Sequence, residues 1–90
     1  MNSLKQNLVG QVVVLRADVF LPQFQALPRR VWKVISGFGA SPVTTGRALI
    51  CRSLYDGEEA RFDGMAVERI ATPDDCTAVE VAKHVQQMEG

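Results

Sequence analysis

A glycine-rich segment near the middle of the chain has the residue types of a phosphate-binding loop. GFGASPVTTGR, residues 37–47, contains three glycines, three hydroxyl side chains and an arginine. A Walker loop requires G-x-x-x-x-G-K-[ST] between a strand and a helix, but Gly39 and Gly46 are seven positions apart and no lysine follows. Pro42 stands where a G-x-G-x-x-G motif has its third glycine. We therefore interpret the segment as a long hairpin loop, and an anion or small-molecule site there ranks below the two hypotheses that follow.

The residue types that serve as nucleophiles, bases or metal ligands do not converge in this sequence. The single histidine, His84, follows Glu80 by one helical turn, which is typical of a surface pair. Cys51 falls within a predicted strand and is expected to be a small core residue. Cys76 lies beside two aspartates that disfavour a thiolate, and no zinc or calcium spacing is present. We expect no catalytic residues, no metal site, no cofactor and no enzymatic activity.

Length and composition favour a single globular domain over residues 1–90. The chain has 90 residues, of which 47% are hydrophobic, enough for one modest core. It contains no apolar run long enough to span a membrane and no signal-like apolar region near its start. We therefore expect a cytoplasmic protein with two free thiols and no membrane partner.

A net charge of zero hides an uneven distribution of charge along the chain. Residues 1–55 contain seven basic side chains and one acidic side chain, a balance of +6, whereas residues 56–90 have three basic and nine acidic ones, a balance of −6. The two halves either neutralise each other on a mixed surface or form one basic and one acidic face.

Short β-branched and apolar runs separated by turn signals predict five strands, over residues 10–16, 30–36, 47–55, 58–62 and 67–71. The first connection is apolar but contains Pro22 and Pro28, which exclude a long helix. Asp56-Gly57 predicts a two-residue type I′ hairpin turn. Alternation places Ala60 and Phe62 in the core.

The last 19 residues, 72–90, predict one helix. Thr72 is the expected N-cap, with Pro73 at the first helical position. One stripe at helical spacing needs to be covered by the chain's own sheet or by a second copy; it consists of Ala78, Val81, Ala82, Val85 and Met88.

This spacing of elements resembles the small SH3-like β-barrel superfamily, whose members bind peptides and nucleic acids. The resemblance extends over residues 9–71 and depends on VVVLR, YDGEEARF and VERIA. It implies a mainly β fold, a five-stranded barrel over residues 9–71, followed by one C-terminal α-helix over residues 72–90.

Two functional hypotheses follow. The first is a non-catalytic interaction module that forms a homodimer or docks on a protein partner, with an interface that includes Phe20, Phe24, Val81 and Val85. The second is a nucleic-acid-binding barrel that uses Arg29, Arg30, Trp32, Lys33, Phe38 and Arg47. Trp32, which is flanked by cations, either stacks on a ligand or completes the core.

Overall fold

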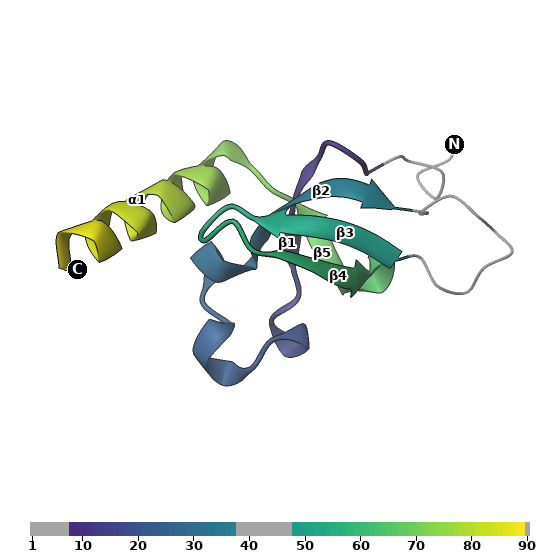
Figure 1. Ribbon diagram of the computed structural model, residues 1–90, viewed down its shortest axis with the longest axis horizontal. Coiled ribbons are helices and arrows are strands. Elements are labelled where there is room, and N and C mark those ends of the chain that lie inside the picture. The colour runs from purple at the N-terminus through teal and green to yellow at the C-terminus, as the bar shows by residue number, and fades with distance from the viewer. Residues whose placement is uncertain (1–7, 38–47, 90) are drawn as a thin grey trace, which may run out of the picture.

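The chain folds as a five-stranded antiparallel sheet with one C-terminal helix (Figure 1). The computed structural model describes residues 8–37 and 48–89. The sheet order is β4-β3-β2-β1-β5, and the prediction of a mainly β chain with a terminal helix is confirmed. The elements are β1 (Val12–Leu15), β2 (Val31–Gly37), β3 (Ala48–Ser53), β4 (Glu59–Asp63), β5 (Val67–Ile70) and α1 (Pro73–Glu89).

The sheet is not closed into the expected barrel. β4 and β5 form its two edges, and they are joined by a single 3-10 turn, η5 (Gly64–Ala66), without pairing to each other in the described part of the chain. β1 and β5 have only four residues each, and their register shifts between Val14 and Leu15. Barrel closure requires a continuous register around the sheet, which strands this short do not provide.

The inner face of the sheet contains most of the core. Side chains alternate along β1, β2 and β3, so that Val13, Trp32 and Cys51 are buried on this face. Ala60 and Phe62 of β4 pack against the same cluster, as their alternation predicted, and Cys51 is the small core residue that was expected.

The first connection consists of three 3-10 turns, namely η2 (Ala17–Val19), η3 (Pro22–Phe24) and η4 (Leu27–Arg30). Pro22 and Pro28 lie at the starts of η3 and η4, where a missing N–H has no cost. Between η2 and η3, Phe20 folds onto the inner face, with its ring 5.7 Å from that of Phe62 and 6.2 Å from that of Trp32. The connection is therefore anchored to the core by Phe20.

The β3–β4 hairpin differs from the predicted two-residue turn. The Gly57 N–H donates to the Ser53 carbonyl at 2.9 Å, and the Ser53 N–H donates to the Glu58 carbonyl at 2.8 Å, so the loop comprises residues 54–57. A type I′ turn needs positive φ at both central residues. Gly57 has φ +77, but no non-glycine residue in the described part of the chain, Asp56 included, has positive φ. The prediction of a type I′ turn was wrong.

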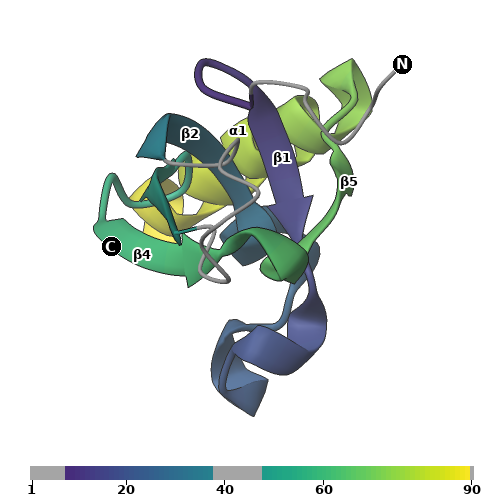
Figure 2. The ribbon, with the colours of Figure 1, turned by 90° about the vertical axis from the view of Figure 1, so that its right-hand side faces the viewer.

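Helix α1 lies against the outer face of the sheet, close to β1, β2 and η4, and its C-terminal half extends beyond the sheet (Figures 1 and 2). Val79 is fully buried against Val14 and Val31. The predicted stripe is not buried as one surface, because Val81 and Val85 are 58% and 47% exposed whereas Ala78 and Ala82 are half-buried, and the Met88 side chain lies outside the described part of the chain. The predicted N-cap is confirmed, since the Thr72 hydroxyl accepts from the Asp75 N–H at 3.3 Å.

Candidate interaction surfaces

Trp32 is a core residue. Its side chain is only 7% exposed, and its ring meets the ring of Phe62 edge-on at 4.9 Å. The indole N–H donates to the Arg29 carbonyl at 2.8 Å, which satisfies its only polar atom. Of the two alternatives for Trp32, the structure therefore supports a place in the core, and the Trp32 ring is not available for stacking on a ligand.

Arg30 links the first connection to the sheet. Its guanidinium donates to the Gln25 carbonyl and to the Leu15 carbonyl, each at 2.9 Å, and Nη1 lies 3.6 Å from a Glu68 carboxylate oxygen. The side chain is only 17% exposed. Arg30 therefore satisfies backbone carbonyls inside the fold and presents little charge to a partner.

Arg29 is held between two aromatic rings. Its guanidinium carbon lies 4.4 Å from the ring centre of Tyr55 and 5.3 Å from that of Phe24, within cation–π range. The Tyr55 hydroxyl is hydrogen-bonded to the Gln86 side chain. This arrangement connects the first connection to the C-terminal half of α1, and it places Phe24, which is 38% exposed, at the edge of the contact.

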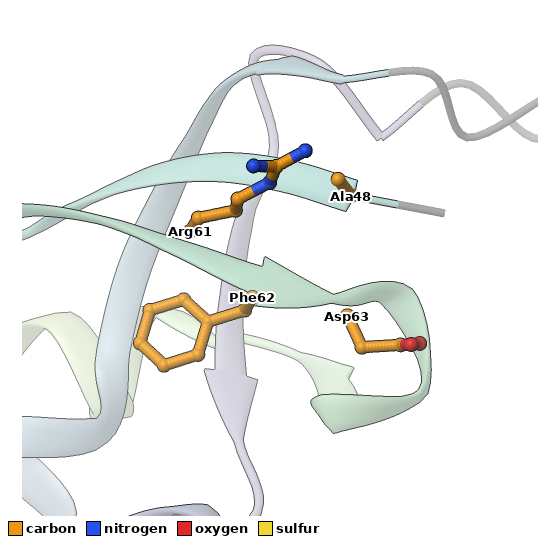
Figure 3. Close-up of a pocket in the computed structure, with 4 residues that line it drawn as sticks. All are labelled: Ala48, Arg61, Phe62 and Asp63. Atoms are coloured by element: carbon orange, nitrogen blue, oxygen red, sulfur yellow. The ribbon is translucent and has the colours of Figure 1, made fainter. Parts of the chain in front are cut away.

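Lys33 belongs to a group of cations that we call the basic sheet face, together with Arg52 and Arg61. Lys33 on β2 is directly opposite Arg52 on β3, which is opposite Glu59 on β4. Arg52 forms a 2.5 Å ion pair with Glu59. Arg61 lies two residues further along β4, opposite Ile50, and its side chain points away from the Phe62 side of the strand (Figure 3). On the outer face, Ile50 thus has Arg61 directly opposite and Arg52 two residues away on the same strand, with Lys33 opposite Arg52.

Two further members of the predicted nucleic-acid surface, Phe38 and Arg47, lie outside the described residues. The four that the structure describes do not form one surface: Trp32 and Arg30 are used within the fold, Arg29 is held by aromatic rings, and Lys33 is on the basic sheet face. That Arg52 and Arg61 are neighbours of Lys33 could not be read from the sequence, because the strand register decides which cations lie side by side.

The exposed side of α1 is the clearest apolar surface of the helix. Asp74, Ala78, Val81 and Val85 follow one another at spacings of four, three and four residues, which places them on one face. Val79 lies on the opposite face. We call this line of four residues the exposed helix face. Two of the predicted interface residues, Val81 and Val85, thus lie together, whereas Phe20 packs against the core.

One open pocket lies beside β4, with a volume of about 260 Å³ and a lining of Ala48, Arg61, Phe62 and Asp63 (Figure 3). It is smaller than the 300–1,000 Å³ of a typical ligand site. Two apolar side chains elsewhere on the surface, those of Leu21 and Met65, are 62% and 75% exposed.

The sequence singled out Cys51, Cys76 and His84 as the side chains with chemical reactivity. Burial raises the pKa of the Cys51 thiol to about 11, which disfavours the nucleophilic thiolate. His84 is exposed on α1. Within residues 8–37 and 48–89 there is no group of three or more His, Cys, Asp or Glu side chains placed to hold a metal ion.

Across the described residues, no helix combines the length and the hydropathy needed to cross a membrane. Comparison of the chain with protein-family models, with curated proteins and with solved structures gave no match.

Proposed function

We propose that this chain is a non-catalytic interaction module, built on an open SH3-like sheet, that self-associates as a homodimer through the exposed helix face. The long first connection, the one-turn η5 bend and the return of β5 to β1 support the SH3-like assignment. The observation that most supports self-association is the position of Val81 and Val85, 58% and 47% exposed on the side of α1 opposite the buried Val79.

Two features of the helix favour an interface on this face. The C-terminal half of α1 extends beyond the sheet, so a partner can approach it without displacing other elements. The bond between Tyr55 and Gln86 holds this half in a fixed direction, which lowers the ordering cost of association. An isologous contact covers the same apolar surface on both copies.

The test is the oligomeric state of the Val81→Asp/Val85→Asp double variant, measured by sedimentation velocity beside the wild-type chain. We expect the wild-type protein to dimerise and the variant to be a folded monomer, because both apolar side chains would be lost from the contact and two carboxylates would have to be desolvated in their place. Met65→Asp is the matched control, since it replaces an exposed apolar side chain away from α1, and it is expected to dimerise. A wild-type monomer at all concentrations would refute self-association, and a dimeric double variant would show that the contact lies elsewhere.

A second function, binding of nucleic acid, is supported by the basic sheet face, on which Lys33 and Arg52 are directly opposite each other. With Trp32 in the core, binding of this kind would depend on phosphate contacts, which carry no sequence information. Its test is a titration with mixed oligonucleotides at low and high salt, in which Lys33→Glu is expected to weaken binding and lower the salt dependence. Absence of binding at low salt would reject this function.

A further inference from the structure

We propose that the exposed helix face of one copy docks on the basic sheet face of a second copy, and that the two copies exchange this contact reciprocally. The inference rests on the self-association proposed above and names the surface that receives α1. Each copy would then contribute one acidic helix and one basic sheet face to a two-fold dimer.

The basic sheet face has a local electrostatic cost within the single chain. Like charges directly opposite each other on neighbouring strands are destabilising, and Lys33 and Arg52 are such a pair. Glu59 is ion-paired with Arg52, whereas Lys33 and Arg61 have no ion-pair partner within the described part of the chain. Lys33 and Arg61 are therefore available to form ion pairs with carboxylates of a second copy.

The exposed helix face has the opposite charge. Asp74 begins the line of the exposed helix face, and Glu80 precedes Val81 on its flank. Both carboxylates are exposed, and neither has an ion-pair partner among the described residues. An apolar pair with two carboxylates on its N-terminal side is thus complementary in charge to Ile50 with its neighbouring cations, as complementary interfaces require.

The spacing of the charges also agrees. Asp74 and Glu80 are six residues apart, which is about 9 Å along a helix axis. Lys33 and Arg61 lie two strand spacings apart across the sheet and two residues apart along it, which together is about 12 Å. A helix that crosses the strands diagonally therefore brings both carboxylates within reach of the two long cationic side chains, with Val81, the residue after Glu80, near Ile50 when Glu80 meets Arg61.

The helix of the same chain cannot make this contact. Its own sheet already holds the Val79 side of α1, which turns Val81 and Asp74 away from that sheet. A second copy has no such restriction, and it presents both complementary surfaces at once.

The experiment uses two charge-reversed full-length chains and a mixture of them. Lys33→Glu/Arg61→Glu reverses the sheet face, and Asp74→Lys/Glu80→Lys reverses the helix face. Each variant alone opposes like charges at both contacts of a homodimer, so self-association should fall by about tenfold or more. In the mixture, the reversed sheet meets the reversed helix and the unchanged sheet meets the unchanged helix, so a heterodimer should form. Sedimentation velocity measures all three samples, and Trp32 fluorescence with circular dichroism verifies folding.

The outcomes separate this inference from the proposed function. A monomeric wild-type chain overturns both. Variants that dimerise as well as the wild type overturn the docking of helix on sheet and leave self-association intact. Monomeric variants that fail to associate when mixed show that the two faces do not meet, which also overturns the inference. If the helix variant does not fold, the wild-type dimer is measured from about 50 mM to about 500 mM NaCl; a contact of this charge must weaken with salt, and an unchanged dimer contradicts it.

Discussion

Arg69 donates two hydrogen bonds to Asp75, from Nη1 at 2.5 Å and from Nη2 at 3.0 Å, and so joins β5 to the first turn of α1. The same carboxylate accepts from the Thr72 N–H at 2.7 Å, while the Thr72 hydroxyl accepts from the Asp75 N–H. This is a capping box with an arginine added. Asp75 is buried, and its bonds determine where the helix leaves the sheet.

The first prediction concerns the pH dependence of this contact. The Arg69 guanidinium and then the Thr72 N–H hold the pKa of Asp75 well below its ordinary value of 3.8. Since the folded state lowers this pKa, ionised Asp75 stabilises the fold above about pH 4, and its contribution is lost progressively as the pH falls below that. Thermal melts should show that Asp75→Asn is less stable than the wild type at pH 7, and that the difference narrows toward pH 2. In dilute samples, where no dimer contributes, Asp74→Asn at the exposed neighbouring position should change stability far less; equal losses would contradict the role of Asp75.

Gly57 provides a test of backbone conformation. It has φ +77, and a Cβ added there would meet no atom within 4 Å, so Gly57→Ala would cause conformational strain without a clash. We expect a loss of about 1 kcal/mol in the free energy of unfolding, measured by urea denaturation. Gly57→Asn should lose less, because asparagine tolerates positive φ. A loss that is equal in both variants would point to a cause other than φ.

The strands and the helix start were predictable because their signals are local. Alternation in β4 placed Phe62 inward, and Thr72 with Pro73 defined the helix start. Barrel closure and the type of the hairpin turn were not predictable in this way. Closure depends on strand lengths and register across the whole sheet, and the turn depends on where Ser53 pairs, which Asp56-Gly57 does not determine.

The candidate sites required tertiary information. A tryptophan beside cations looks the same in the sequence whether it stacks on a ligand or fills a core. Only the contact between the rings of Trp32 and Phe62 shows that Trp32 fills the core. Arg30 looks like a surface cation until the Leu15 carbonyl is seen to lie within its reach. The neighbours of Lys33 follow only from the register that places Arg52 opposite it.

Arg30 should therefore matter for stability more than for binding. Arg30→Gln removes charged donors from the carbonyls of Leu15 and Gln25, and we expect a loss of about 1–3 kcal/mol in the free energy of unfolding. Lys33→Gln, which removes the same charge at an exposed position, should remain within about 0.5 kcal/mol of the wild type in dilute samples, where association adds nothing to stability. Chemical denaturation of both variants makes the comparison, and a stable Arg30→Gln chain would mean that water replaces the guanidinium at little cost.

The two thiols should differ in reactivity. Cys51 is fully buried, and burial raises its pKa to about 11, so few molecules carry the thiolate at pH 8. Cys76 is half-buried in the first turn of α1. Alkylation at pH 8, followed by peptide mapping, should modify Cys76 before Cys51 in the folded chain and both at similar rates in denaturant. Rapid modification of Cys51 in the folded chain would show that the sheet opens around it.

The last prediction distinguishes the two sides of α1. Val79 is fully buried with Val14 and Val31, whereas Val81 is 58% exposed. Val79→Ala removes buried methyl groups and leaves a small cavity, which should cost about 1–3 kcal/mol. Val81→Ala should change the free energy of unfolding of the monomer by about 0.5 kcal/mol or less.

If Val81 lies in a dimer contact, its substitution should matter only at concentrations where the dimer forms, because association adds to the stability of the folded state. Urea denaturation at low and high protein concentration should therefore give the same loss of unfolding free energy for Val79→Ala at both concentrations. For Val81→Ala, the loss should be larger at the high concentration than at the low one. A larger loss for Val81→Ala than for Val79→Ala in the dilute sample would mean that the helix packs through the opposite side.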